Sequence, residues 1–251
     1  MVAKRIIPCL DVKDGMTVKG INFEGLKEVG DAVALGSRYA SDGADELVYL
    51  DISATREGRR TFIGLVEKVA SCIDIPFTVG GGISDVDTAA RLLDAGADKI
   101  SINSAAVRTP QLIGEIASRY GSQFVVVAID AKQIDGRWAA TVKGGSELTD
   151  RELFSWAREA QERGAGEILF TSMDHDGTCA GYPCGTYAEL CSTLSIPVIA
   201  SGGAGSVQDI ADVLTAGRAD AALAASIFHY DRIPIPYLKK ELKERNICVR
   251  I

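Results

Sequence analysis

The chain has 251 residues, 47% of them apolar and 24% charged, with a formal net charge of −7. This composition is typical of a soluble globular protein, and the acidic balance argues against general binding to nucleic acid or to anionic membranes. The sequence has no apolar run of roughly 20 residues, no signal-peptide pattern and no C-x-x-C pair among its six cysteines, so we expect a cytoplasmic protein without a membrane segment, bound metal or other cofactor.

The first predicted strand, "RIIPCLD" at residues 5–11, carries a charge at each end of an apolar run. Arg5 and Asp11 are six residues apart, and side chains alternate along a strand, so both are expected on the same face. This arrangement raises the question of what a cation at the start and an anion at the end of one strand each do.

Seven more β-rich segments follow, at residues 46–52, 76–81, 99–103, 124–130, 167–172, 197–203 and 220–226. Helical patterns lie between them, at 31–42, 84–96, 109–121, 149–164 and 206–217, and several open on a capping residue and end at Gly. Eight βα units in about 250 residues predict an α/β fold of the (β/α)₈ TIM barrel type. An open doubly wound sheet is the alternative, but no G-x-G-x-x-G follows the first strand.

The sequence also repeats itself. "IPFTVGGGISDVDTAARLLDAGAD" from Ile75 aligns with "IPVIASGGAGSVQDIADVLTAGRAD" from Ile196, and "GADELVYL" from Gly43 matches "GAGEILFT" from Gly164. "LDVKDG" from Leu10 likewise matches "IDAKQIDG". Chance explains one such pair more easily than three in register. We therefore predict one barrel domain over residues 1–251, built from half-barrels at about 1–121 and 122–251, with a pseudo-twofold active site.

Two aspartates at equivalent positions of the repeat are the candidate catalytic residues. Asp11 and Asp130 end the first and fifth predicted strands, and catalytic groups of this fold lie at the carboxyl ends of strands. A single aspartate there is more often a cap or a turn residue. Two equivalent carboxylates in a shielded mouth are suited to divide into a general acid and a general base.

Glycine clusters end the third and seventh predicted strands, at Gly80–Gly82 and at Gly202 and Gly203, and the fourth and eighth end in Asn103–Ser104 and Ala225–Ser226. Glycine lets backbone N–H groups approach an anion, and the loops after strands seven and eight usually hold phosphate in this fold. The duplication predicts two facing phosphate sites. Further substrate candidates are Lys19, in a long loop after the first strand, and Thr171, Asp176 and Ser201 near strand ends; each has a turn, cap or solvent-exposed alternative.

Charged residues also begin four predicted strands: Arg5, Glu46, Lys99 and Glu167. Because side chains alternate along a strand, these four point into the barrel if the residues at the strand ends do. They would then form salt bridges at the N-terminal end of the barrel, its floor. Charges at this end commonly serve stability alone. An inward ring carries a desolvation cost that apolar side chains avoid, so a role in binding a partner or in passage is the alternative.

With these features, the chain resembles the cyclase subunits of imidazole glycerol phosphate synthase, over essentially its whole length. The stretches that carry the resemblance are "AKRIIPCLDVKDG", "VKGINF", "GADELVYLDIS", "VGGGI", "GADKISINSAAV", "RGAGEIL", "IASGGAG" and "ADAALAASIFH". The resemblance implies an enzyme of histidine biosynthesis. It implies a reaction of ammonia with ribulosyl-formimino aminoimidazole carboxamide ribonucleotide (PRFAR), giving imidazole glycerol phosphate and aminoimidazole carboxamide ribotide (AICAR).

The resemblance also implies residue roles. Asp11 and Asp130 match the acid/base pair, and Lys19 matches the mobile substrate loop. The glycine clusters (Gly81, Gly82, Gly202, Gly203), with Ser104 and Ser226, match the phosphate sites. Arg5, Glu46, Lys99 and Glu167 match a gate for ammonia from a glutaminase subunit (HisH) docked on the N-terminal face, with Asp98 at the docking position.

The sequence departs from the family pattern at Gln133, Ser146, Asp150, Cys179, Pro183 and Cys184, which puts the rate and loop geometry in question. Two rival functions stay open at this point. One is the sister isomerase of the same pathway, which needs no ammonia. The other is a catalytically weak barrel that binds and activates a glutaminase; the intact aspartate pair argues against this role, and the altered loops leave it open.

Overall fold

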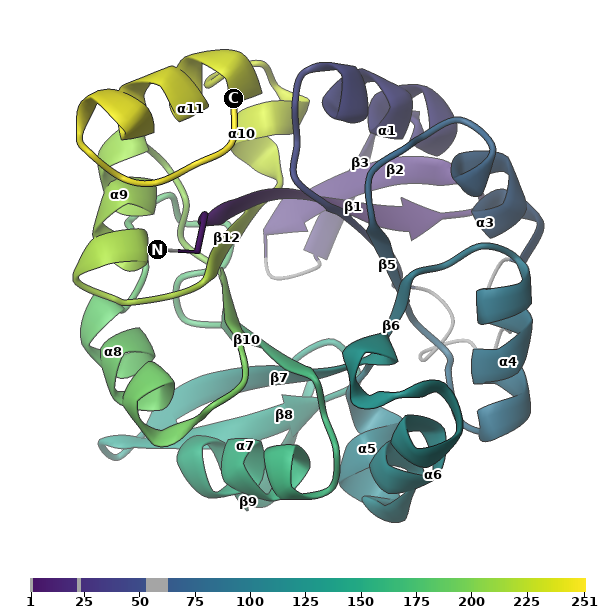
Figure 1. Ribbon diagram of the computed structural model, residues 1–251. Helices are drawn as coiled ribbons and strands as arrows, with labels where there is room; N and C mark the ends of the chain where they lie inside the picture. The colour runs from purple at the N-terminus through teal and green to yellow at the C-terminus, as the bar shows by residue number, and fades with distance from the viewer. Residues whose placement is uncertain (1, 22–23, 53–62) are drawn as a thin grey trace.

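Parallel strands close into a barrel in the computed structural model, which describes residues 2–21, 24–52 and 63–251 (Figure 1). Neighbouring strands pair in the order β1, β4, β5, β6, β7, β10, β11 and β12, and the β12–β1 and β10–β7 pairings complete the circle. The predicted (β/α)₈ barrel is therefore confirmed. The strands are β1 (Arg5–Lys13), β4 (Leu47–Asp51), β5 (Phe77–Gly80), β6 (Lys99–Ile102), β7 (Val125–Ile134), β10 (Glu167–Ser172), β11 (Val198–Ser201) and β12 (Ala221–Ala224).

Helices surround the barrel (Figure 1). Two of them, at Asp31 and Ser206, begin at the capping residue that the sequence predicts, and the helix predicted from residue 84 is capped one residue later, at Asp85. Each of these three caps accepts a hydrogen bond from a backbone N–H three residues on. None of the helices in the described ranges is long and apolar enough to cross a membrane. They are α1 (Ala32–Ser41), α3 (Ile63–Ala70), α4 (Val86–Asp94), α5 (Ser104–Arg108), α6 (Gln111–Tyr120), η1 (Ser122–Phe124), α7 (Leu153–Glu162), α8 (Cys184–Thr193), α9 (Val207–Thr215), α10 (Ser226–His229) and α11 (Ile235–Glu244).

Two barrel strands continue into antiparallel extensions that the sequence did not reveal. After β1 come β2 (Met16–Ile21) and β3 (Glu24–Asp31), where a long loop was predicted. After β7 come β8 (Arg137–Val142) and β9 (Glu147–Glu152). The helix predicted at 149–164 was wrong at its start, because residues 149–152 pair in β9 and the helix begins at Leu153, capped by Glu152.

The interior has two apolar layers. The large cluster lies between the strands and the helices, whereas a smaller one fills the inside of the barrel. On β1 this inner cluster contains Ile7 and Cys9, which lie between Arg5 and Asp11 on the same face of the strand. Its members are Ile7, Cys9, Val48, Val126, Leu169, Ile199, Ala221 and Leu223, all buried.

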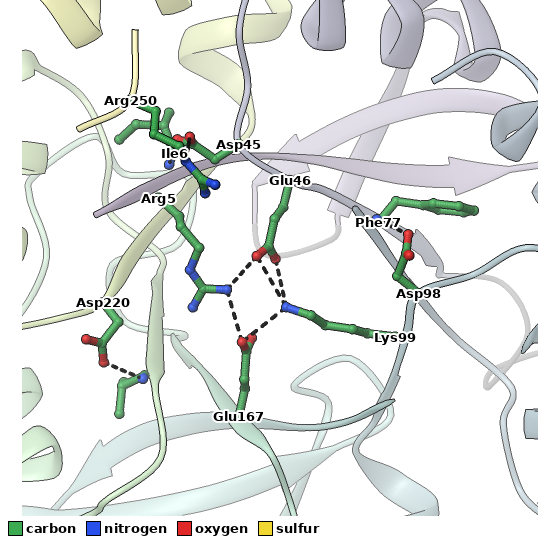
Figure 2. Close-up of polar contacts among 11 residues, drawn as sticks. Arg5, Ile6, Asp45, Glu46, Phe77, Asp98, Lys99, Glu167, Asp220 and Arg250 are labelled. Carbon is green, nitrogen blue, oxygen red and sulfur yellow. Dashed lines mark hydrogen bonds and ion pairs between the residues drawn. The ribbon is translucent and has the colours of Figure 1, made fainter. Parts of the chain in front are cut away.

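Aspartates before three strands connect neighbouring strands at the N-terminal end of the barrel (Figure 2). Asp45 accepts a hydrogen bond from Ile6 N at 2.8 Å, Asp98 from Phe77 N at 3.0 Å and Asp220 from Val198 N at 2.9 Å. Each aspartate also donates its own N–H to the carbonyl of the same partner. The Ala-Asp pair that recurs before these three strands thus satisfies backbone N–H groups at strand starts.

Glycine replaces the aspartate at the fourth equivalent position, Gly166. Its N–H donates to Val125 O, but a Cβ there would lie 2.1 Å from Ser122 O. The backbone of η1 therefore occupies the space that a carboxylate would need.

Asp45 also holds the C-terminal segment. Its buried carboxylate contacts Lys239 Nζ of α11 and Arg250 Nε, each at 3.0 Å. The Lys239 side chain is 5% exposed, so the Asp45 carboxylate is the counter-charge that stabilises its buried ammonium group. The strand β1, the helix α11 and the C-terminus thus meet at one carboxylate.

We predict that Asp45→Ala lowers the free energy of unfolding by about 3–5 kcal/mol, because it leaves the Lys239 ammonium buried without a counter-charge. Asp220→Ala is the matched control. It loses the same kind of backbone hydrogen bond, but its side chain is 46% exposed, so we expect a loss of about 1 kcal/mol. Urea unfolding of both variants measures the difference, and equal losses would contradict the role of the buried ion pair.

Candidate active site

A cavity of about 1450 Å³ opens at the carboxyl ends of the barrel strands. Every residue predicted from the sequence to serve catalysis or substrate binding lines it. The structure thus brings together side chains and backbone from both halves of the chain. These residues are Asp11, Lys19, Gly81, Gly82, Asn103, Ser104, Asp130, Thr171, Asp176, Ser201, Gly202, Gly203, Ala225 and Ser226.

Asp11 is buried at the end of the inward face of β1, and only 3% of its surface is exposed. Its Oδ2 lies 3.2 Å from Lys19 Nζ, which β2 carries back over the strand end. Burial raises the pKa of the Asp11 carboxyl, and the Lys19 charge opposes that rise. Lys19 therefore favours the charged form of the Asp11 carboxyl group. The sequence predicted Lys19 in a loop, whereas the structure places it on β2.

Asp130 lies at the equivalent place on β7, with different partners. Asn103 Nδ2 donates to its Oδ2 at 3.0 Å, and Thr171 pairs with it across β7 and β10. Burial raises the pKa of Asp130 to about 6, although hydrogen bonds from Thr171 and Asn103 favour the charged form. Asp176, a further acid of the cavity, raises the pKa of both Asp11 and Asp130.

The two glycine clusters have backbones that only glycine tolerates. Gly81 has φ +102°, and a Cβ there would lie 2.3 Å from Asp51 O. Gly203 has φ +122°, and a Cβ there would lie 2.1 Å from Gly181 O. Both clusters thus combine left-handed backbone with close packing, which leaves the cavity wall made of main chain.

The residues after β6 and β12 also share one geometry. Asn103 and Ala225 have φ values of −122° and −123°, and each precedes a short helix that begins with serine, Ser104 or Ser226. Both serines line the cavity. The starts of two short helices, each with a serine, therefore line the cavity at equivalent places.

The opposite end of the barrel is closed by a ring of four charges (Figure 2). Arg5 Nη1 lies 2.6 Å from Glu46 and 3.0 Å from Glu167, and Lys99 Nζ lies 3.1 Å from each of the same two carboxylates. These side chains are 7–15% exposed. Burial opposes the charge on Arg5, but the two carboxylates outweigh it and raise its pKa.

In the turn between β8 and β9, only Ser146 was named from the sequence, as a departure from the family pattern, whereas Lys143 and Gly144 of this turn and Glu147 at the start of β9 line the cavity. The "KGG" run was its only local signal, and that signal could not say which way the extension folds. Asp98, the predicted docking residue, lies outside the cavity on the N-terminal side. Of the six departures from the family pattern, Asp150 lines the cavity, whereas Gln133, Ser146, Cys179, Pro183 and Cys184 are not among its described lining residues.

The chain is similar to proteins of one known family. Residues 5–234 match the family described as "Histidine biosynthesis protein". The protein of Bacteroides fragilis named "Imidazole glycerol phosphate synthase subunit HisF" is 60% identical over 250 residues, and proteins of the same name from Flavobacterium psychrophilum and Parabacteroides distasonis are each 59% identical over 251 residues. Each alignment covers 100% of both chains.

These names agree with the cyclase and not with the sister isomerase. A "subunit" of a synthase also implies a partner subunit. The chain therefore belongs to the histidine biosynthesis protein family and, within it, to the HisF cyclase subunits of imidazole glycerol phosphate synthase.

Proposed function

We propose that Asp11 and Asp130 are the acid/base pair with which this cyclase combines ammonia and PRFAR to give imidazole glycerol phosphate and AICAR. The observation that carries the proposal is a pair of carboxyl groups, Asp11 buried and Asp130 half-buried, at equivalent positions of β1 and β7 in one cavity, both with raised pKa values. Ring closure and cleavage need protons removed and donated at different atoms, and two carboxyl groups in one mouth supply both functions.

The two carboxyl groups have different environments, which supports a division of roles. Asp130 has a pKa of about 6, and no cation of the described residues lies within hydrogen-bond reach of its carboxyl group, so it retains a proton up to near-neutral pH. Asp11 contacts Lys19, whose charge favours the carboxylate. We assign the general acid to Asp130 and the general base to Asp11.

The substrate carries a phosphate at each end, and two equivalent cradles face the cavity. We place one phosphate at Gly81, Gly82 and Ser104 and the other at Gly202, Gly203 and Ser226, where backbone N–H groups can approach an anion. Lys19, Thr171, Asp176 and Ser201 lie between the cradles or beside the carboxylates and would contact the middle of the substrate.

We further propose that ammonia enters through the floor from a glutaminase subunit (HisH) bound to the N-terminal face. The ring of Arg5, Glu46, Lys99 and Glu167 closes that end, and the apolar inner cluster separates it from Asp11. A buried ring of charges is weak evidence for stability, because apolar side chains of similar volume stabilise a core at least as well. A role in passage accounts for the ring better than a role in stability.

We predict that Asp11→Asn and Asp130→Asn each lower ammonium-dependent turnover of PRFAR by a factor of at least about 100, since each removes one proton-transfer group. The assay uses the purified chain and free ammonium, without a glutaminase. Near-parental turnover in either variant would remove that residue from the mechanism.

We also predict a pH-dependent effect on stability. The pKa of Asp130 is about 6 in the fold, against an ordinary 3.8, so the unfolded chain binds fewer protons between these values and stability falls as pH rises through that window. Asp130→Asn lacks this loss. Between pH 4 and pH 7 its stability should therefore rise relative to the parent by on the order of 2 kcal/mol.

Urea midpoints of the parent and of Asp130→Asn at both pH values measure this relative change. Parallel pH profiles for the two proteins would show that Asp130 has an ordinary pKa.

For the partner face, we predict that Asp98→Asn weakens binding of a glutaminase subunit severalfold and leaves ammonium-dependent turnover unchanged. The asparagine oxygen can still accept the hydrogen bond from Phe77 N, so only the charge on the exposed face is removed. Asp220→Asn is the matched control. Undiminished affinity for the glutaminase would exclude Asp98 as a charged docking residue.

A further inference from the structure

The turn that joins β8 and β9 is fixed against the predicted phosphate site at Ser104. Lys143 N donates to Ser104 Oγ at 3.1 Å, which leaves the serine hydroxyl hydrogen available to an anion. The turn is tight, because Lys143, Gly144 and Gly145 all have positive φ. A Cβ on Gly145 would lie 2.3 Å from Met173 Cε, so the turn also packs closely on the buried Met173.

The side chain of Lys143, in contrast to its backbone, is exposed at the cavity. It lines the cavity, is 55% exposed, and pairs with Glu147 four residues on. Glu147 is 54% exposed and also lines the cavity. An exposed pair of this kind contributes little to stability, so a stronger anion can displace the carboxylate at small cost.

Cations are distributed unequally between the two predicted phosphate sites. Those that line the cavity on the Ser104 side are Arg91 of α4, Arg108 of α5 and Lys143, whereas the described lining residues of the β11 and β12 units include no Lys or Arg. Lys13 of β1 and Lys19 of β2 also line the cavity, and β1 pairs with both β12 and β4. The Ser104 side also carries the acids Asp85, Asp87, Glu147 and Asp150. Asp85 is engaged as the cap of α4, and Arg91 bonds back to Thr88 and Asp87 of its own helix.

We propose that Lys143 is a substrate-positioning residue. Its ammonium group exchanges the ion pair with Glu147 for one with the phosphate that binds at Ser104 and Gly82. The inference rests on the proposed phosphate sites and adds to them an electrostatic difference between the two ends of the substrate. Because the Lys143 backbone is held at Ser104, its flexible side chain lies within reach of any phosphate there. Glu147 competes for the same ammonium group when the site is empty.

Three variants test this with free ammonium as nitrogen donor. Lys143→Gln should raise the KM for PRFAR on the order of 3- to 10-fold with little change in kcat, since a charged contact to phosphate is lost. Glu147→Gln should lower the KM roughly 2-fold, because it releases Lys143 and removes a repelling charge. The double variant should behave like Lys143→Gln.

Lys240→Gln, from the exposed Lys240–Glu244 pair of α11, is the matched control and should leave the KM unchanged. If the pair only stabilised the turn, Lys143→Gln and Glu147→Gln would move the KM in the same direction or not at all, and either result would overturn the proposal. Urea midpoints of all variants verify that they are folded.

Direct titration with inorganic phosphate separates this inference from the proposed function. Should the parent consume no PRFAR with ammonium, the proposed catalytic assignment fails, while phosphate binding still tests Lys143. Weaker phosphate binding by Lys143→Gln, with tighter binding by Glu147→Gln, supports the inference. Equal phosphate affinity in the parent and Lys143→Gln refutes it.

Discussion

The closed ladder of parallel strands is the constraint on which the other features depend. Because side chains alternate along a strand, residues two apart share the inside of the barrel from floor to mouth. On β1 this series runs Arg5, Ile7, Cys9 and Asp11, from an ion pair through an apolar layer to a buried carboxylate. One strand thereby joins two polar sites that its apolar middle keeps apart.

The same burial that shapes the barrel gives its two ends different chemistry. At the floor, opposite charges neutralise one another in a closed ring, and each cation contacts two carboxylates. At the mouth, Asp130 receives hydrogen bonds, and among the described residues no cation contacts its carboxyl group, so burial dominates and its pKa rises to about 6. Asp11 has Lys19 beside it. Equivalent positions in the repeat have thus acquired unequal proton affinity, which acid–base chemistry requires.

Local sequence patterns predicted the barrel, the strand residues that face its inside and most of the residues that line the cavity. Strand and helix periods, capping residues and glycine runs act over a few residues, and eight such units in one chain allow few architectures. The antiparallel extensions did not follow, because β2 and β8 pair with the ends of β1 and β7, whose position depends on the closed barrel, and β3 and β9 pair in turn with β2 and β8. Thr149 to Glu152 matched a helical pattern, yet pairing with β8 prevailed over local propensity.

The sequence by itself therefore determined the fold class, the strands that carry Asp11 and Asp130, the glycine clusters and the charges that begin four strands, because each depends on residues that are neighbours in the chain. It did not determine where the first and fifth strands end, since β1 continues to Lys13 and β7 to Ile134. Only the tertiary structure decided what those groups contact: Lys19 with Asp11, Asn103 with Asp130, and Lys143 with Ser104. These contacts join different strands and loops, and their distances and burial, which set the pKa values, exist only once the barrel has closed.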